Sequence, residues 1–184
     1  NGKTEFQRAR NECLMELLYA SGMRISELMS LPVSIARGGP KMILIKGKGS
    51  KERLVPLSPP ALGALDRWLK FRDKKEDLSI KAGLNRSNFL FPSNSKNGHL
   101  TRNWFFNKIK SWAIEAGVRS ENVSPHTIRH AFATHLLSNG ADLRVIQTIL
   151  GHSDIATTEI YTHIVNDKLK STLEEHHPLS IKSK

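Results

Sequence analysis

The chain has 184 residues, 39% of them hydrophobic and 24% charged, which suits one globular domain with a substantial core. Its 28 Lys and Arg outnumber its 17 Asp and Glu, so the formal net charge is +11. This excess favours a polyanionic partner, with a solvated basic surface as the alternative. No run of about 18 apolar residues and no signal peptide occurs. The single cysteine excludes an internal disulfide, which fits a reducing cytoplasm. We therefore expect a cytoplasmic protein, and the lack of an apolar run predicts no membrane segment.

Two helices are predicted before Pro32. Apolar residues recur at three- or four-residue steps through residues 4–20, namely Phe6, Ala9, Cys13, Leu17 and Ala20. Gly22 is a candidate left-handed cap, and a second, short helix follows from Ser26. Arg24 lies at the start of that helix, where the helix dipole favours an acid. Arg24 is therefore a candidate for binding an anion, with a solvated arginine as the alternative.

A β-hairpin is predicted next. Residues 42–45 and 53–57 have strand character, and the segment Gly47-Lys48-Gly49-Ser50 forms the turn between them. The spacing of a nucleotide-binding loop, G-x-x-x-x-G-K-[ST], is absent. The tip carries Lys46, Lys48 and Lys51, which on their own suit a solvated strand edge.

The middle of the chain contains two further predicted helices. The first begins at Ser58 with two prolines and places Leu62, Leu65 and Leu69 on one face. Residues 72–88 are charged and low in apolar content, which predicts a mobile loop, and residues 89–92 suit a short buried strand. The second helix runs from a Thr101 cap to Ala116.

The C-terminal third contains the strongest candidates for chemistry. Ser124 and Pro125 open a helix in which His126 and Arg129, three residues apart, share one face. Helices are also predicted over residues 143–150, around Tyr161 and over residues 167–175. Two imidazoles (His126 and His152), a guanidinium and a phenol together indicate chemistry on an anionic group. The histidine and cysteine spacings of zinc sites are absent, so a metal site is not expected.

These motifs resemble the tyrosine recombinase family over almost the whole chain. The matching segments are R-I-S-E-L, G-K-G-S-K-E-R, H-T-I-R, L-G-H and the tyrosine of I-Y-T-H. Within the family, A-T-H-L-L-S-N-G-A-D-L-R, L-G-H-S-D and H-H-P-L are most similar to the bacterial Xer recombinases. The resemblance implies a mainly α fold with a small antiparallel β-sheet (α+β). Residues 1–184 would be the C-terminal catalytic domain, without the family's N-terminal core-binding domain, and residues 167–184 would contact a neighbouring subunit.

The resemblance also implies a set of catalytic residues and their roles. The matching positions are Arg24, Lys48, His126, Arg129, His152 and Tyr161. Tyr161 would attack a DNA phosphate to form a 3′-phosphotyrosyl link, and the two arginines would clamp its non-bridging oxygens. The two histidines would assist proton transfer, and Lys48 would protonate the leaving 5′ oxygen. Because the covalent link keeps the bond energy, no ATP, metal or other cofactor is implied.

The implied function is site-specific DNA recombination, in the form of chromosome dimer resolution of the Xer type. The implied partners are a double-stranded DNA recombination site, a XerC-like recombinase in a tetrameric synaptic complex and an FtsK-like DNA translocase. A phage or integron integrase with the same chemistry is an alternative, because the target site is not legible in the sequence. A DNA-binding module without catalysis is another alternative, and it predicts no covalent DNA adduct.

Overall fold

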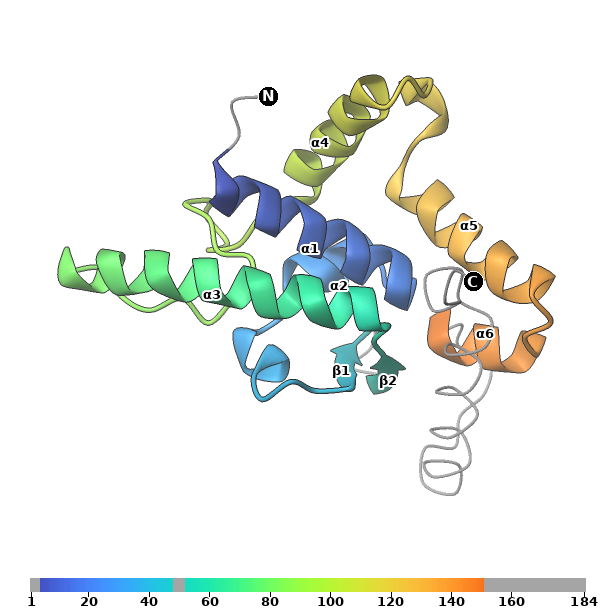
Figure 1. Ribbon diagram of the computed structural model, residues 1–184, viewed down its shortest axis with the longest axis horizontal. Helices are drawn as coiled ribbons and strands as arrows, with labels where there is room; N and C mark the ends of the chain where they lie inside the picture. The colour runs from blue at the N-terminus through green and yellow to red at the C-terminus, as the bar shows by residue number, and fades with distance from the viewer. Residues whose placement is uncertain (1–3, 48–51, 151–184) are drawn as a thin grey trace.

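The fold is mainly helical, with one two-stranded antiparallel sheet in the part of the chain that the computed structural model describes, residues 4–47 and 52–150 (Figure 1). Its elements are α1 (Glu5–Ser21), α2 (Ile25–Met29), η1 (Val33–Ala36), β1 (Met42–Lys46), β2 (Glu52–Pro56), α3 (Pro59–Lys81), α4 (Arg102–Glu115), η3 (Ser120–Asn122), α5 (Pro125–Ser138) and α6 (Leu143–Leu150). The predicted fold class is confirmed. None of these helices is long and apolar enough to cross a membrane.

Helix α1 is fixed at both ends by local capping. Thr4 accepts a hydrogen bond from the Gln7 backbone N–H at the N-terminus. Gly22 is left-handed (φ 55°), and its N–H donates to the Leu18 carbonyl at 3.0 Å. The predicted helix and its glycine cap are thereby confirmed. In Figure 1, α1 lies alongside α3, and these two helices form the most extensive helix pair.

One part of the core lies between α1, α3 and the segment around residue 90. Trp68 of α3 is fully buried, in an edge contact with Phe6 and stacked on Phe91. Its indole N–H donates to the Leu90 carbonyl at 3.0 Å, which satisfies the only polar atom of the side chain. Cys13 is buried in the same core, as expected, and burial raises the pKa of its thiol well above the usual value.

The hairpin is paired from Met42↔Pro56 at its base to Lys46↔Glu52 at the end nearest the turn. Ile43, Ile45 and Val55 point inward and are buried, so one face of the hairpin packs on the core. The two predicted strands are confirmed to within one residue. Lys48 and Lys51 lie outside the described residues.

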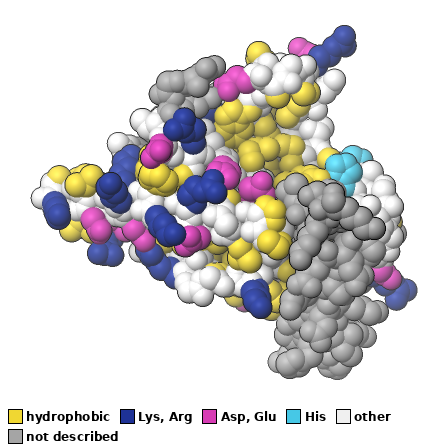
Figure 2. All heavy atoms as spheres, in the orientation of Figure 1, with side chains coloured by type: hydrophobic (Ala, Val, Ile, Leu, Met, Phe, Trp, Pro, Cys, Tyr) yellow, Lys and Arg dark blue, Asp and Glu magenta, His cyan; other side chains and the backbone are white. Residues whose placement is uncertain are grey.

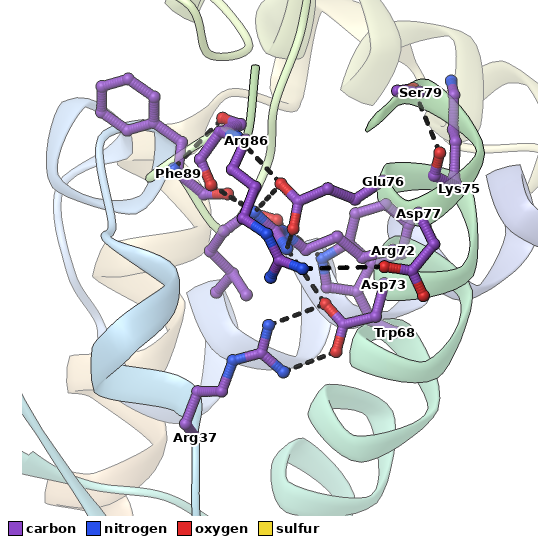
Figure 3. A network of polar contacts seen from close by, with 12 residues as sticks. Arg37, Trp68, Arg72, Asp73, Lys75, Glu76, Asp77, Ser79, Arg86 and Phe89 are labelled. Atoms are coloured by element: carbon purple, nitrogen blue, oxygen red, sulfur yellow. Dashed lines mark hydrogen bonds and ion pairs between the residues drawn. The ribbon is translucent and has the colours of Figure 1, made fainter. Parts of the chain in front are cut away.

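The prediction of a loop over residues 72–88 is wrong up to Lys81, because α3 continues to that residue. Polar contacts hold this charged half of the helix in place (Figure 3). Arg72 is buried and donates to the carboxylates of Asp73 and Glu76 and to the carbonyls of Ser87 and Phe89. A low apolar content therefore did not prevent a helix here, since the charged side chains satisfy one another and the returning chain.

The predicted strand over residues 89–92 is also wrong in detail. The segment forms two isolated bridges, Pro32↔Phe89 and Pro92↔His99, although Leu90 and Phe91 are buried as expected. Proline at each bridge lacks the N–H that a longer ladder requires.

The last three α-helices of the described part, α4 to α6, lead the chain back to α1. Thr101 and Ser124 cap α4 and α5 as predicted, each accepting a backbone N–H three residues ahead. Helix α4 lies on the opposite side of α1 from the hairpin, whereas α5 and α6 lie near the C-terminal end of α1 (Figure 1). Phe132 and Leu136 bury one face of α5. One corner of the molecule is therefore surrounded by five parts of the chain: the end of α1, the start of α2, the hairpin, α5 and α6.

Candidate functional site

Three of the six predicted site residues belong to the described part of the chain. Arg24 is the N-cap of α2, and His126 and Arg129 lie in the first turns of α5. Lys48, His152 and Tyr161 lie outside the described residues. The site is therefore built from the two arginines and the groups that hold them.

Arg24 is held by Glu27, three residues later in the same short helix. The backbone N–H of Arg24 donates to Glu27 Oε2 at 2.7 Å, and its Nη1 donates to Oε1 at 3.0 Å. Glu27 thus supplies the acid that the start of a helix favours, in the manner of a capping box. The local sequence places a cation at the helix start together with the carboxylate that balances it.

Arg53 of β2 contacts the same carboxylate from the other side. Its Nη1 donates to Glu27 Oε1 at 3.0 Å and its Nη2 to Oε2 at 2.7 Å, while its Nε donates to the Ile149 carbonyl at 2.9 Å. Both partners are largely buried, with exposed side-chain fractions of 9% for Arg53 and 6% for Glu27. This two-point fork joins the hairpin to α2 and to the end of α6.

The Glu27 carboxylate stays ionised despite its burial. Burial alone raises its pKa, but the hydrogen bonds and charges of Arg53 and Arg24 outweigh that effect and hold the pKa below the usual value. A carboxylate with two guanidinium partners is therefore a fixed negative charge at neutral pH.

Arg129 reaches the same corner from α5. Its Nη1 donates to the Gly22 carbonyl at 2.5 Å, and its Nη2 donates to the Leu150 carbonyl in the last turn of α6. Burial and then the like charges of Arg24 and Arg53 lower its pKa to about 10, so it remains a cation at neutral pH. The two carbonyls fix the plane of the guanidinium.

These four residues, Arg24, Arg53 and Arg129 with Glu27, form what we call the arginine cluster. Three positive charges against one negative charge leave an excess of positive charge in a partly buried place. Arg24 is its solvent-facing member, with 40% of its side chain exposed. Within the cluster, the solvent-facing Arg24 and the nearby Arg129 are suited to binding a phosphate group, whereas Arg53 donates to Glu27 and to the Ile149 carbonyl.

The structure thus brings Arg24 and Arg129 together, as expected for a shared anion site. His126 is exposed on the first turn of α5, after the Ser124 cap and three residues before Arg129. Residues three apart on a helix lie on one face, so His126 shares a face of α5 with Arg129.

Sequence reasoning missed Glu27 and Arg53 as site residues. For Glu27 a local signal existed, because an acid three residues after a helix-start arginine matches capping-box spacing. Arg53 is the last residue of the matching segment G-K-G-S-K-E-R, but its partners Glu27 and Ile149 are 26 and 96 residues away in sequence. Only the fold shows which groups it contacts.

The chain is similar in sequence and fold to known proteins. A sequence profile described as the phage integrase family matches residues 2–168. A protein of Agrobacterium fabrum named tyrosine recombinase XerD is 47% identical over 100% of this chain and 57% of its own length. Its namesake in Bradyrhizobium diazoefficiens is 49% identical over 92% of this chain and 53% of its own length. The crystal structure of XerH site-specific recombinase bound to its difH substrate, as a pre-cleavage complex, is 31% identical with a TM-score of 0.67, covering 95% of this chain and 48% of that one.

Proposed function

The chain belongs to the phage integrase family, and from this premise we propose that it is the catalytic part of a site-specific recombinase of the Xer type, which cuts and rejoins DNA through Tyr161. The chain spans about half the length of the curated relatives it matches. The names of those relatives and the DNA substrate of the XerH complex support the proposal.

The observation that carries the proposal is the arginine cluster. Arg24 and Arg129 come from segments more than a hundred residues apart, yet they lie at the same corner. Arg24 contributes to lowering the pKa of Glu27, and its like charge contributes to lowering the pKa of Arg129. Paired guanidinium groups stabilise the extra negative charge that a phosphate acquires in the transition state of a displacement. Two such groups allow phosphoryl transfer without assigning any role to a metal ion.

The proposed reaction is a reversible transesterification. The Tyr161 oxygen attacks the phosphorus and loses its proton, the bond from phosphorus to the 5′ oxygen breaks, and that oxygen takes a proton from Lys48. Arg24 and Arg129 bind the non-bridging oxygens, and His126 and His152 hydrogen-bond the phosphate and assist proton transfer. A 5′-hydroxyl from a second strand then reverses the step, which exchanges strands.

The proposed partners are those that the family resemblance implies, and the DNA substrate in the XerH complex supports the first of them. We propose a double-stranded recombination site as substrate and a XerC-like recombinase as partner in a tetrameric complex, acting in chromosome dimer resolution in the bacterial cytoplasm. Residues 167–184 would contact the neighbouring subunit of that complex. An FtsK-like translocase would regulate it.

The test is formation of a covalent adduct on a nicked duplex that traps the intermediate. The wild-type chain should give a protein–DNA band that resists denaturant, and Tyr161→Phe should give none while binding the duplex with unchanged affinity, since only the hydroxyl is lost.

Tyr19→Phe is the matched control, because Tyr19 is the other tyrosine of the chain and its hydroxyl bonds to Nδ1 of His135 at 2.6 Å. This variant should keep the adduct. An adduct in Tyr161→Phe, or none in the wild type, would refute the proposed mechanism.

A further inference from the structure

Arg53 is placed where it can control one end of the hairpin. It is the second residue of β2 and pairs with Ile45, one step from the Lys46↔Glu52 pair at the end of the ladder nearest the turn. The side chains of this pair are both exposed and form an ion pair at 3.3 Å. Exposed pairs of this kind contribute little to fixing a backbone.

The contacts of Arg53 are of a different kind. Three of its nitrogens donate, two to Glu27 and one to the Ile149 carbonyl, and the side chain is largely buried. The acceptors belong to α2 and to the last turn of α6, whose terminal carbonyls carry partial negative charge. Arg53 is therefore the polar side chain, among the described residues of β2, that fastens this end of the hairpin to both helices.

Loss of the Arg53 side chain would change the attachment of the hairpin but would leave Arg24 with its partner. Glu27 would still accept the backbone N–H and Nη1 of Arg24, so that arginine keeps its partner. The base of the hairpin would keep its buried residues Ile43 and Val55. What would be lost is the attachment of the strand end that continues, in sequence, toward Lys48.

We infer that Arg53 is a positioning residue for the protonation step: its fork to Glu27 and its bond to the Ile149 carbonyl hold the turn end of the hairpin against α2 and α6. This inference rests on the proposed function, because it assumes that Lys48 donates the proton. Arg53 itself does not touch the DNA phosphate in this role. Its role is to anchor β2, the strand that follows Lys48 in the sequence.

The leaving group gives a way to isolate this role. An alkoxide leaving from phosphorus needs a proton, whereas a thiolate is far less basic and leaves without one. A duplex with sulfur in place of the bridging 5′ oxygen therefore bypasses the acid but still requires Tyr161 and the phosphate-binding arginines. A defect in protonation is rescued by sulfur, and a defect in phosphate binding or folding is not.

The experiment measures adduct formation at saturating protein on oxygen and sulfur duplexes for the wild type, Arg53→Met and Arg53→Lys. Arg53→Met should slow cleavage of the oxygen duplex by about 10- to 100-fold, the size of effect that misplacing a catalytic group produces. Its rate on the sulfur duplex should stay near the wild-type rate. Because an unfolded fraction lowers both rates equally, the sulfur-to-oxygen ratio reports positioning and is insensitive to stability.

Arg53→Lys keeps the positive charge near Glu27, so it disturbs the fold less than Arg53→Met does. Because a lysine cannot bond both carboxylate oxygens and the Ile149 carbonyl, its sulfur-to-oxygen ratio should also be raised. Arg67→Met is the matched control, since Arg67 forms an exposed ion pair with Glu12, and its ratio should equal that of the wild type. Unchanged ratios in both Arg53 variants would overturn the inference.

Failure of the proposed function has a different signature. If the wild type forms no adduct on either duplex, the recombinase proposal is wrong. If the wild type cleaves both duplexes but sulfur does not rescue Lys48→Ala, the assignment of the acid is wrong, and the inference about Arg53 falls with it. Rescue of Lys48→Ala without rescue of Arg53→Met would reject the inference alone.

Discussion

At the scale of single residues, the charge of Glu27 determines whether three arginines can share one corner of the molecule. Glu27→Gln removes the carboxylate that accepts from both Arg24 and Arg53, and it removes the negative charge that offsets the nearby charge of Arg129. Breaking a buried ion pair by changing one partner typically costs about 3–5 kcal/mol, and we expect a loss of that size in the free energy of unfolding measured in urea. Glu12→Gln, in the exposed pair with Arg67, should cost less than about 1 kcal/mol.

The effect of Glu27 should also depend on pH. Its pKa in the folded protein lies below the unfolded value, so its contribution to stability is fully present above the unfolded pKa of about 4.3. That contribution is lost as pH falls through the folded pKa. The stability difference between wild type and Glu27→Gln should therefore be constant near neutral pH and shrink in acid. A difference that does not change down to the acid transition would show that the carboxylate charge is unimportant.

At the scale of elements, the site depends on how closely α5 and α6 approach the end of α1. Gly22 is left-handed, and a Cβ there would lie 2.5 Å from Phe132 Cδ1 and 2.9 Å from Leu150 Cδ2. Gly22→Ala should therefore combine left-handed strain with overpacking and lower the free energy of unfolding by about 2–5 kcal/mol. Cleavage should fall as well, because the Gly22 carbonyl accepts from Arg129.

Gly39→Ala separates the two contributions. Gly39 has a similar φ of 65°, but nothing lies within 4 Å of its Cβ position. It should lose only the strain energy of about 1–2 kcal/mol and leave the cleavage rate of folded protein unchanged. Equal losses in the two variants would mean that the approach of α5 and α6 to Gly22 is not the constraint we describe.

At the scale of the whole molecule, the net charge of +11 should govern binding to DNA. On the face shown in Figure 2, Lys and Arg alternate with Asp and Glu over α3, so the excess does not form a basic surface there. Each phosphate contact lowers the logarithm of the binding constant with a slope of about −0.9 against the logarithm of salt concentration. Fluorescence anisotropy with a labelled duplex should show an affinity that falls by more than about tenfold between 50 and 200 mM salt. An affinity independent of salt would contradict a role for the excess charge in binding phosphates.

The sequence by itself determined the features that depend on residues close by in the chain. The periodicity of α1, the Gly22 cap, the Ser124 cap and the hairpin follow from local sterics and hydrogen bonding, and each was predicted close to its observed place. Motif spacing also selected Arg24 and Arg129, because it reflects a known family.

Only the tertiary structure decided what holds these parts together. The contacts of Arg72 stabilise a helix in a segment whose composition predicts a loop. Arg53 donates to a carboxylate 26 residues away and to a carbonyl 96 residues away. A charged side chain looks the same in sequence whether it will be solvated or buried. Its role is set by which acceptors the fold brings to it, since burial makes an unpaired charge costly and a paired one directional.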